Sequence, residues 1–231
     1  MRRNVATHLT VLSMAAFAVA GCAKDPTEGK AAATVAAPQA QAEKAAPAAA
    51  PAPAVTETLA VATEGSKIGF VGAKVTAQHV GEFKAFTGKV GLADGKIEGG
   101  KVEFEVKTAE MTVDEGKAPK LEGHLKSPDF FDVEKFPTAT FTSTAIKAGS
   151  DQAGMTHTVT GDFEIRGVKR TVTFPAKIEV GASAVTAKTE FGINRKDFGI
   201  EYAGMPDDLI KDNVLITVDF NAPRGTTADK Q

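Results

Sequence analysis

Lys101-Val102-Glu103-Phe104-Glu105-Val106-Lys107 places an apolar side chain at every second position, with charged residues between them. Successive side chains of an extended strand point to opposite faces, so the two Val and the Phe share one face, and Lys and Glu occupy the other. The stretch therefore predicts a β-strand that buries one face and presents the other to water.

The same alternation recurs along the chain, and turn signals rich in Gly and Asp separate the alternating segments. We expect strands at 68–77, 83–92, 101–107, 138–146, 157–165, 172–180, 187–193 and 214–220. Eight mostly antiparallel strands joined by short turns fit either a β-sandwich or a closed barrel, so the predicted fold class is all-β. A barrel of this number has an interior that side chains fill or that holds one small ligand.

One segment, 118–135, interrupts the alternation. Leu121 and Leu125 are four residues apart, a spacing that suits a short helix, and the adjacent Phe130 and Phe131 cannot both follow a period of two. The segment is predicted to be a short helical lid on the sheet.

The overall composition excludes several classes of protein. A formal net charge of −2 gives no electrostatic reason to expect nucleic acid as a partner, and one Cys excludes a disulfide framework. A membrane-spanning barrel needs girdles of Trp and Tyr, whereas this chain has no Trp and a single Tyr. The apolar strand faces are therefore expected to point inward.

The first 22 residues have the features of an export signal. Two arginines near the start precede an apolar run at 9–20, and Val19-Ala20-Gly21-Cys22 follows. This resembles a bacterial lipobox, which implies a signal peptide at 1–21 and a diacylglycerol on Cys22; the alternative is an ordinary signal peptide with a chance Cys. The lipobox reading predicts a chain attached to the membrane through acylated Cys22, palmitate being a typical acyl chain. The Ala at position 23 favours the outer membrane, facing the periplasm.

The composition changes twice more along the chain. Residues 23–62 hold 17 Ala and five Pro with almost no large apolar side chain, so 22–63 is expected to be a disordered tether. Residues 64–223 carry the alternating pattern and are expected to form one domain, followed by a disordered tail at 224–231.

Reactive side chains are sparse in this sequence. His79, His124 and His157 are not spaced like ligands on one helix, and no P-loop, Gly-x-Ser-x-Gly or dinucleotide motif occurs. We expect no metal, no cofactor and no enzymatic activity. His157 shares the alternating face of its strand with apolar residues, where a buried His is a commoner outcome than a ligand-binding one.

Several segments of the domain resemble the pattern of the YceI-like family. They are Ser127-Pro128-Asp129-Phe130-Phe131-Asp132, Phe136-Pro137-Thr138-Ala139-Thr140-Phe141-Thr142-Ser143, Gly161-Asp162-Phe163-Glu164-Ile165-Arg166-Gly167-Val168, Arg195-Lys196-Asp197-Phe198-Gly199-Ile200 and Ile210-Lys211-Asp212-Asn213-Val214. The resemblance implies an eight-stranded antiparallel lipocalin-like barrel in the bacterial periplasm. It also implies that a long isoprenoid or fatty amphiphile is bound inside the barrel.

Two functions from different classes remain. One is a lipid-binding protein, and the other is a structural or interaction module with a filled barrel; small inward residues such as Ala176 and Ala187 favour the first. The predicted lipid-binding residues are Phe70, Phe104, Val106, Leu125, Phe130, Phe131, Phe141, Phe163, Ile165, Val172, Phe174, Phe191 and Ile193. Candidate contacts to a polar head group are His157, Arg195 and Asp197. A period of two places Arg195 and Asp197 on one face of a strand-like segment, where a structural ion pair between them is the commoner outcome.

Overall fold

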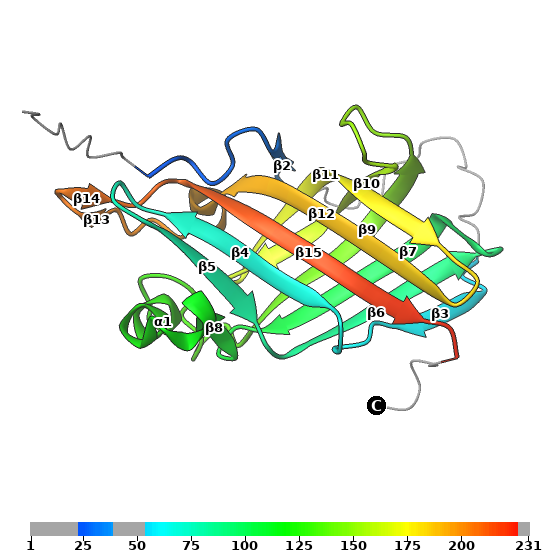
Figure 1. The fold of residues 1–231 in the computed structure, drawn as a ribbon, viewed down its shortest axis with the longest axis horizontal. Helices are drawn as coiled ribbons and strands as arrows, with labels where there is room; N and C mark the ends of the chain where they lie inside the picture. The colour runs from blue at the N-terminus through cyan, green and yellow to red at the C-terminus, as the bar shows by residue number, and fades with distance from the viewer. Residues whose placement is uncertain (1–22, 39–53, 226–231) are drawn as a thin grey trace, which may run out of the picture.

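A computed structural model describes residues 23–38 and 54–225. Figure 1 shows long strands that form one sheet curled around an interior, with a short helix at one end. The strands are β1 (Ala31–Ala32), β2 (Thr34–Ala36), β3 (Glu57–Ala60), β4 (Lys67–Ala73), β5 (Gln78–Phe83), β6 (Phe86–Ala93), β7 (Lys96–Lys107), β8 (Met111–Val113), β9 (Thr138–Ala148), β10 (His157–Ile165), β11 (Val168–Val180), β12 (Ala184–Asn194), β13 (Gly204–Met205), β14 (Asp208–Leu209) and β15 (Asn213–Pro223). The helices are η1 (Asp114–Gly116), α1 (Pro119–Lys126) and η2 (Arg195–Phe198).

The main sheet runs in the order β3-β6-β7-β9-β10-β11-β12-β15-β4-β5-β8, and every neighbouring pair in it is antiparallel. β13 and β14 form a separate hairpin. The architecture is thus a mostly antiparallel sheet curled into a partial barrel, which confirms the predicted all-β class.

The alternation that predicted β7 determines which of its faces is buried. Val102 and Val106 are buried, Phe104 packs against the core, and the intervening glutamates are on the other face. The interior of the curled sheet is therefore the hydrophobic core of the molecule.

The expected count of eight strands is wrong. The segment 68–77 contains nearly all of β4 and the turn after it, which the Lys74 N–H closes by donating to the Ala77 carbonyl at 2.8 Å. β5 and β6 then replace the single strand expected at 83–92, and the short strands β3 and β8 add to the sheet. Periodicity alone does not reveal a tight turn between two segments that are both apolar on one face.

The predicted helix is confirmed as α1. Pro119 occupies a first-turn position, where its missing N–H costs nothing, and Leu125 is the buried residue of the helix. The Glu122 carboxylate accepts a hydrogen bond from the Val113 N–H at 2.9 Å, which fixes α1 to β8. The helix therefore lies at one end of the sheet, below β5 in Figure 1.

The prediction of a disordered tether over 22–63 needs correction. Residues 31–36 pair with the main sheet, β1 in parallel with β12 and β2 antiparallel to β11, and Ala33 and Val35 pack against the core. β3, near the end of the same segment, pairs with β6. The expected signal peptide at 1–21, the acylated Cys22, residues 39–53 of the tether and 226–231 of the tail lie outside the described residues.

The N-terminal strands fill a place where two long strands diverge. β11 and β12 pair with each other only from Lys177 to Val180 of β11, and elsewhere their facing edges bond to other strands. β2 pairs with Thr171–Thr173 of β11, and β1 pairs with Phe191 and Gly192 of β12. Because small Ala side chains fit between the diverging strands, an Ala-rich stretch that looked like a spacer completes the sheet.

Removing 23–38 should therefore destabilise the domain. A chain beginning at residue 39 loses the β1 and β2 hydrogen bonds and the burial of Val35, at a cost of about 2 kcal/mol in the free energy of unfolding. Urea denaturation of this chain and of one beginning at residue 23 measures the difference. Equal midpoints and slopes would show that the segment contributes nothing to the fold.

Candidate functional site: an apolar cavity open at one end

The curled sheet encloses a cavity of about 470 Å³. Its wall is mostly aliphatic and aromatic, with side chains from β4, β5, β7, β9, β10, β11, β12 and β15 and from the region of α1. This volume lies in the range of about 300–1,000 Å³ that is typical of small-molecule sites. The cavity is thus large enough for a ligand and offers it little besides apolar surface.

Glycines on neighbouring strands make room for the phenylalanine rings of the wall. A Cβ on Gly81 would lie 2.1 Å from the ring of Phe70, and one on Gly161 would lie 2.6 Å from the ring of Phe141. Each ring therefore lies over the bare backbone of its neighbour instead of extending across the cavity. Glycines inside predicted strands are a signal of such close packing.

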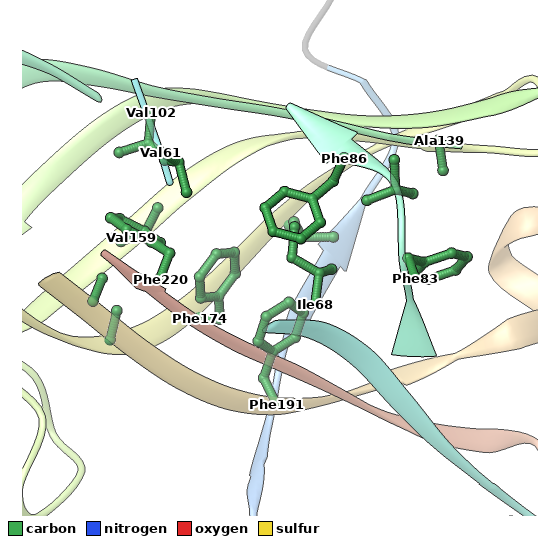
Figure 2. Packing of buried hydrophobic residues seen from close by; sticks show 14 of the residues in the cluster. Val61, Ile68, Phe83, Phe86, Val102, Ala139, Val159, Phe174, Phe191 and Phe220 are labelled. Carbon is green, nitrogen blue, oxygen red and sulfur yellow. The ribbon is translucent and has the colours of Figure 1, made fainter. Parts of the chain in front are cut away.

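The rings also brace one another. Phe174 and Phe191 stack with centroids 4.1 Å apart and planes at 8°, and Phe141 lies 5.5 Å from Phe174. Figure 2 shows Phe174, Phe191 and Phe220 converging on the interior from different strands. Because Phe has few rotatable bonds, such a wall stays in place at a low entropic cost.

Twelve of the thirteen residues predicted to bind lipid line this cavity. They are Phe70, Phe104, Val106, Leu125, Phe130, Phe131, Phe141, Phe163, Ile165, Phe174, Phe191 and Ile193. The exception is Val172, which is fully buried and pairs with Gly161 and Val35 but does not line the open volume. The alternating pattern predicts that a residue lies on the inner face of the sheet. It does not predict where along the strand the cavity ends.

The prediction omitted other wall residues that its own pattern contained. Alternate residues of β15 line the cavity, as do Val102 of β7 and Phe198 of η2. The β15 residues are Val214, Ile216, Val218 and Phe220. They form one alternating face in the sequence, so the signal was present.

The cavity is polar at one end only. Lys74, His79, Tyr202, Asp208 and Lys211 line it near the β4–β5 turn and the β13–β14 hairpin. Towards the β11–β12 turn the wall consists of buried apolar side chains such as those of Ile178 and Phe220. The mouth therefore lies at the end that carries α1 and the hairpin.

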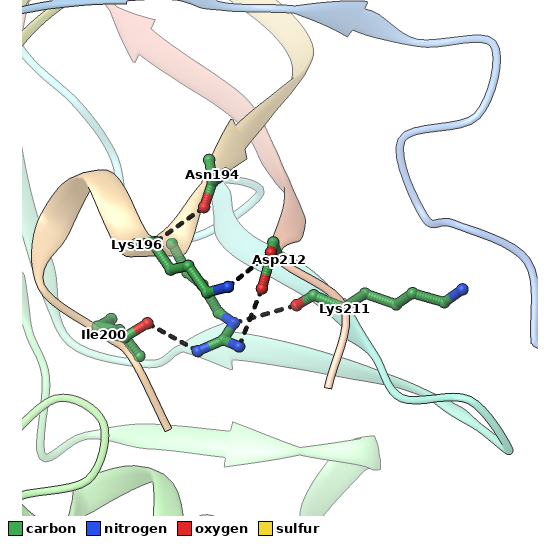
Figure 3. A network of polar contacts seen from close by, with 6 residues as sticks. Asn194, Lys196, Ile200, Lys211 and Asp212 are labelled. Atoms are coloured by element: carbon green, nitrogen blue, oxygen red, sulfur yellow. Dashed lines mark hydrogen bonds and ion pairs between the residues drawn. The ribbon is translucent and has the colours of Figure 1, made fainter. Parts of the chain in front are cut away.

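Arg195 lies at this mouth and is only 4% exposed. Its guanidinium donates to the carbonyl of Lys211 at 3.1 Å, to that of Ile200 at 2.7 Å and to the Asp212 carboxylate at 3.2 Å (Figure 3). Burial lowers the pKa of Arg195 from its usual value, and the charge of Asp212 opposes that shift. The side chain stays charged, since Arg does not deprotonate in proteins.

The expected pairing of Arg195 with Asp197 is wrong. Residues 195–198 form η2 rather than a strand, so the period of two that placed the two side chains on one face does not apply. Arg195 instead pairs with Asp212, and Asp197 does not line the cavity. Arg195 alone remains a candidate contact for a polar head group.

His157 has polar partners and is mostly buried, the outcome held to be the commoner one, and the structure does not support it as a head-group contact. It lies 3.5 Å from the Glu98 carboxylate and 2.7 Å from the Thr156 hydroxyl, outside the cavity. It occupies the start of β10, beyond Val159, where the strand passes the closed end of the cavity. It is therefore not placed to meet a ligand.

Within residues 23–38 and 54–225, no group of three or more His, Cys, Asp or Glu side chains could hold a metal ion. In the same ranges no helix is both long and apolar enough to cross a bilayer. The expectations that the protein needs no cofactor and is not an enzyme stay predictions.

A curled antiparallel sheet around one apolar cavity, with a helix at its mouth, defines the lipocalin-like class of β proteins. The model of the YceI-like domain matches residues 59–222. This match covers well over half of the chain, which therefore belongs to the YceI-like family.

Two bacterial relatives illustrate the similarity. A UPF0312 protein of Pseudomonas putida is 35% identical over 130 residues, an alignment that covers 54% of this chain and 65% of that protein. A UPF0312 protein of Shewanella denitrificans is 32% identical over 149 residues, which cover 58% of this chain and 74% of the relative. The chain thus spans just under two thirds of the length of the first of these relatives.

Two solved structures share the fold. BcnA of Burkholderia cenocepacia has a TM-score of 0.61 at 24% identity, covering 70% of this chain and 99% of its own. A polyisoprenoid-binding domain from Saccharophagus degradans, implicated in plant cell wall breakdown, has a TM-score of 0.54 at 15% identity, covering 71% of this chain and 97% of its own. At these identities the likeness supports the fold.

Proposed function

We propose that this protein binds a single long-chain apolar or isoprenoid lipid in the interior of the curled sheet. The observation that carries the proposal is the 470 Å³ apolar cavity that opens at one end. The polyisoprenoid-binding name of one structural neighbour supports the same class of ligand. Transport, storage and sequestration of that lipid are all compatible with such a site.

The chemistry of the wall favours a hydrocarbon tail. Even Thr189, a hydroxyl-bearing residue of the wall, donates its hydroxyl to the Pro175 carbonyl at 2.6 Å and so presents no free donor to a ligand. At about 0.8 kcal/mol per buried CH₂, burying ten methylenes contributes about 8 kcal/mol before association costs. Binding by apolar burial alone therefore reaches a useful affinity without specific polar contacts.

The mouth provides the place for a polar head group. Three of the five guanidinium N–H groups of Arg195 have the partners named above. The rings of His124 and Tyr202, 5.0 Å apart, also line the cavity. Leu125, Phe130 and Phe131 belong to the cavity lining, which supports a role of α1 and the following turns as a lid.

The alternative is a structural or interaction module whose interior needs no ligand. The two functions differ in whether the delipidated protein takes up an apolar probe. We expect saturable uptake of one equivalent of a fluorescent fatty or prenyl probe, and competition by unlabelled isoprenoid alcohol. An absence of saturable uptake would favour the structural module.

We also propose that acylated Cys22 anchors the chain in the bacterial envelope, with the barrel in the periplasm and the outer membrane as the favoured location. The support is the lipobox-like Val19-Ala20-Gly21-Cys22. Nucleic acid is not expected as a partner, in keeping with the net charge of −2.

Replacing Cys22 with Ser should release the protein from the membrane fraction. A thioether-linked diacylglycerol and an amide-linked acyl chain hold a protein far more firmly than one myristoyl chain, and the variant lacks the thiol that carries them. Cell fractionation and intact mass of the wild type and variant measure the effect. A variant that still sediments with membranes and is still cut after Gly21 would contradict the assignment.

A further inference from the structure

The β13–β14 hairpin projects beyond the open end of the curled sheet (Figure 1). It carries two of the few large apolar side chains that are strongly exposed, Met205 at 61% and Leu209 at 49%. Met205 pairs with Asp208 and Leu209 with Gly204, so the two side chains project from opposite faces of the hairpin. A narrow hairpin with an exposed apolar side chain on each face suits entry into an apolar phase better than docking on a flat protein surface.

The hairpin is held firmly to the β4–β5 turn. The Val75 N–H donates to the Leu209 carbonyl at 3.0 Å, and the Asp208 carboxylate accepts from the N–H and hydroxyl of Thr76 and pairs with Lys74. The hydrogen bond from Lys74 lowers the pKa of Asp208 from its usual value, so the carboxylate stays charged at neutral pH. The direction in which the hairpin points is therefore fixed relative to the sheet.

The chain enters the described structure at this same turn. The Val75 carbonyl accepts a hydrogen bond from the Ala23 N–H at 2.7 Å, so Val75 joins the backbone of Ala23 to that of Leu209. The Gln78 side chain donates to the Lys24 carbonyl at 2.7 Å, and that of Asn213 donates to Asp25 at 3.1 Å. Cys22 is one residue before Ala23, a Cα step of about 3.8 Å. Ala23, the first described residue, thus bonds to the turn that holds the hairpin, and the proposed anchor residue precedes it directly in the sequence.

The hairpin also borders the mouth of the cavity. Gly204, Met205 and Asp208 belong to its lining, together with Ile210 just after β14. The exposed apolar hairpin, the start of the described chain at Ala23 and the polar end of the cavity therefore lie together.

We infer that this end of the molecule rests on a lipid bilayer, with the β13–β14 hairpin in the interfacial layer and the cavity opening directly against the membrane. The inference rests on the proposed function, since it specifies where the lipid enters. It replaces the picture of a barrel held away from the membrane on a long tether, because Ala23 already bonds to the β4–β5 turn.

The contact is expected to be apolar rather than electrostatic. Charges near the hairpin are of both signs, with Lys24, Lys74 and Lys211 against Asp25, Asp207 and Asp208. Asp207, in the turn of the hairpin, favours a shallow position among the head groups. Zwitterionic phosphatidylcholine vesicles should therefore support the contact as well as anionic ones.

A reporter on the hairpin tests the contact directly. Cys22 is the only Cys of the chain and is blocked when acylated, so Leu209→Cys introduces one reactive thiol for an environment-sensitive dye. Val180→Cys is the matched control, since Val180 is a 38% exposed apolar residue near the opposite, β11–β12 end of the sheet. In anchored protein on phosphatidylcholine vesicles, a nitroxide lipid should quench the dye at 209 and not the dye at 180. No quenching at 209, or equal quenching at both positions, would overturn the inference whether or not the cavity binds lipid.

A transfer measurement tests the consequence for function. Leu209→Asp should slow probe transfer from vesicles to the protein about tenfold, the equivalent of about 1.4 kcal/mol, while Val180→Asp leaves it unchanged. Leu209 does not line the cavity, so affinity for a probe added from solution should be kept. Transfer at the wild-type rate by Leu209→Asp would contradict the role of the hairpin, whereas no uptake of dissolved probe by the wild type would contradict the proposed function instead.

Discussion

Ala176→Phe should greatly weaken lipid binding while the protein stays folded. Ala176 is buried in β11 and its side chain lines the cavity, so a phenyl ring at this position extends into open volume. Displacing the equivalent of four buried methylenes, at about 0.8 kcal/mol each, lowers the affinity about 200-fold. Because the ring enters a cavity rather than a close-packed core, the usual overpacking cost of about 1–3 kcal/mol should be largely avoided.

The matched control for this variant is Lys177→Phe. Lys177 is the next residue of the same strand, and it is exposed on the outer face of the sheet. The Lys177→Phe variant adds the same ring outside the cavity, so its affinity for the probe should equal that of the wild type. Titration of delipidated proteins with a fluorescent fatty probe measures both; equal affinity in Ala176→Phe and wild type would favour the structural module over the binding protein.

Arg195→Met should have the largest effect on stability. The variant keeps the length of the side chain but leaves the carbonyls of Ile200 and Lys211 without their donor in a buried place. At about 1–3 kcal/mol for each unsatisfied group, the free energy of unfolding should fall by about 3 kcal/mol. Chemical denaturation followed by circular dichroism measures this change.

Lys196→Met provides the comparison. Lys196 also pairs with Asp212, at 2.8 Å, but its side chain is 48% exposed. An exposed ion pair contributes at most about 1 kcal/mol, so this variant should unfold close to the wild type. If both variants lost the same stability, the buried hydrogen bonds of Arg195 would not be the reason for its position.

The strand positions could largely be predicted because burial of one sheet face imposes a period of two on the sequence. The face formed by Val102, Phe104 and Val106 is the clearest example, and α1 followed from the spacing of Leu121 and Leu125. Most of the cavity wall followed from the same rule. A local pattern therefore predicts which residues face the interior.

Features that depend on distant parts of the chain could not be predicted in this way. Asp212, the partner of Arg195, is 17 residues away in the sequence. Residues 195–198 form a 3₁₀ helix, so the alternation of a strand, on which the pairing with Asp197 was based, does not apply. The pairing of Thr34–Ala36 with Thr171–Thr173 depends on the divergence of β11 from β12, which leaves no local trace in an Ala- and Pro-rich stretch. The composition showed correctly that this stretch is poor in large apolar residues. It could not show that β11 and β12 leave a space in which small side chains fit.

Native mass spectrometry of the full-length protein isolated from its own membranes tests the central claim most directly. We expect the folded protein to carry one non-covalent apolar molecule in addition to the lipid on Cys22, and solvent extraction to release a long-chain or isoprenoid compound. The same preparation of Ala176→Phe should lack the adduct, while Lys177→Phe should retain it. A wild-type protein that carries no adduct and that, once delipidated, takes up no apolar probe would contradict the account.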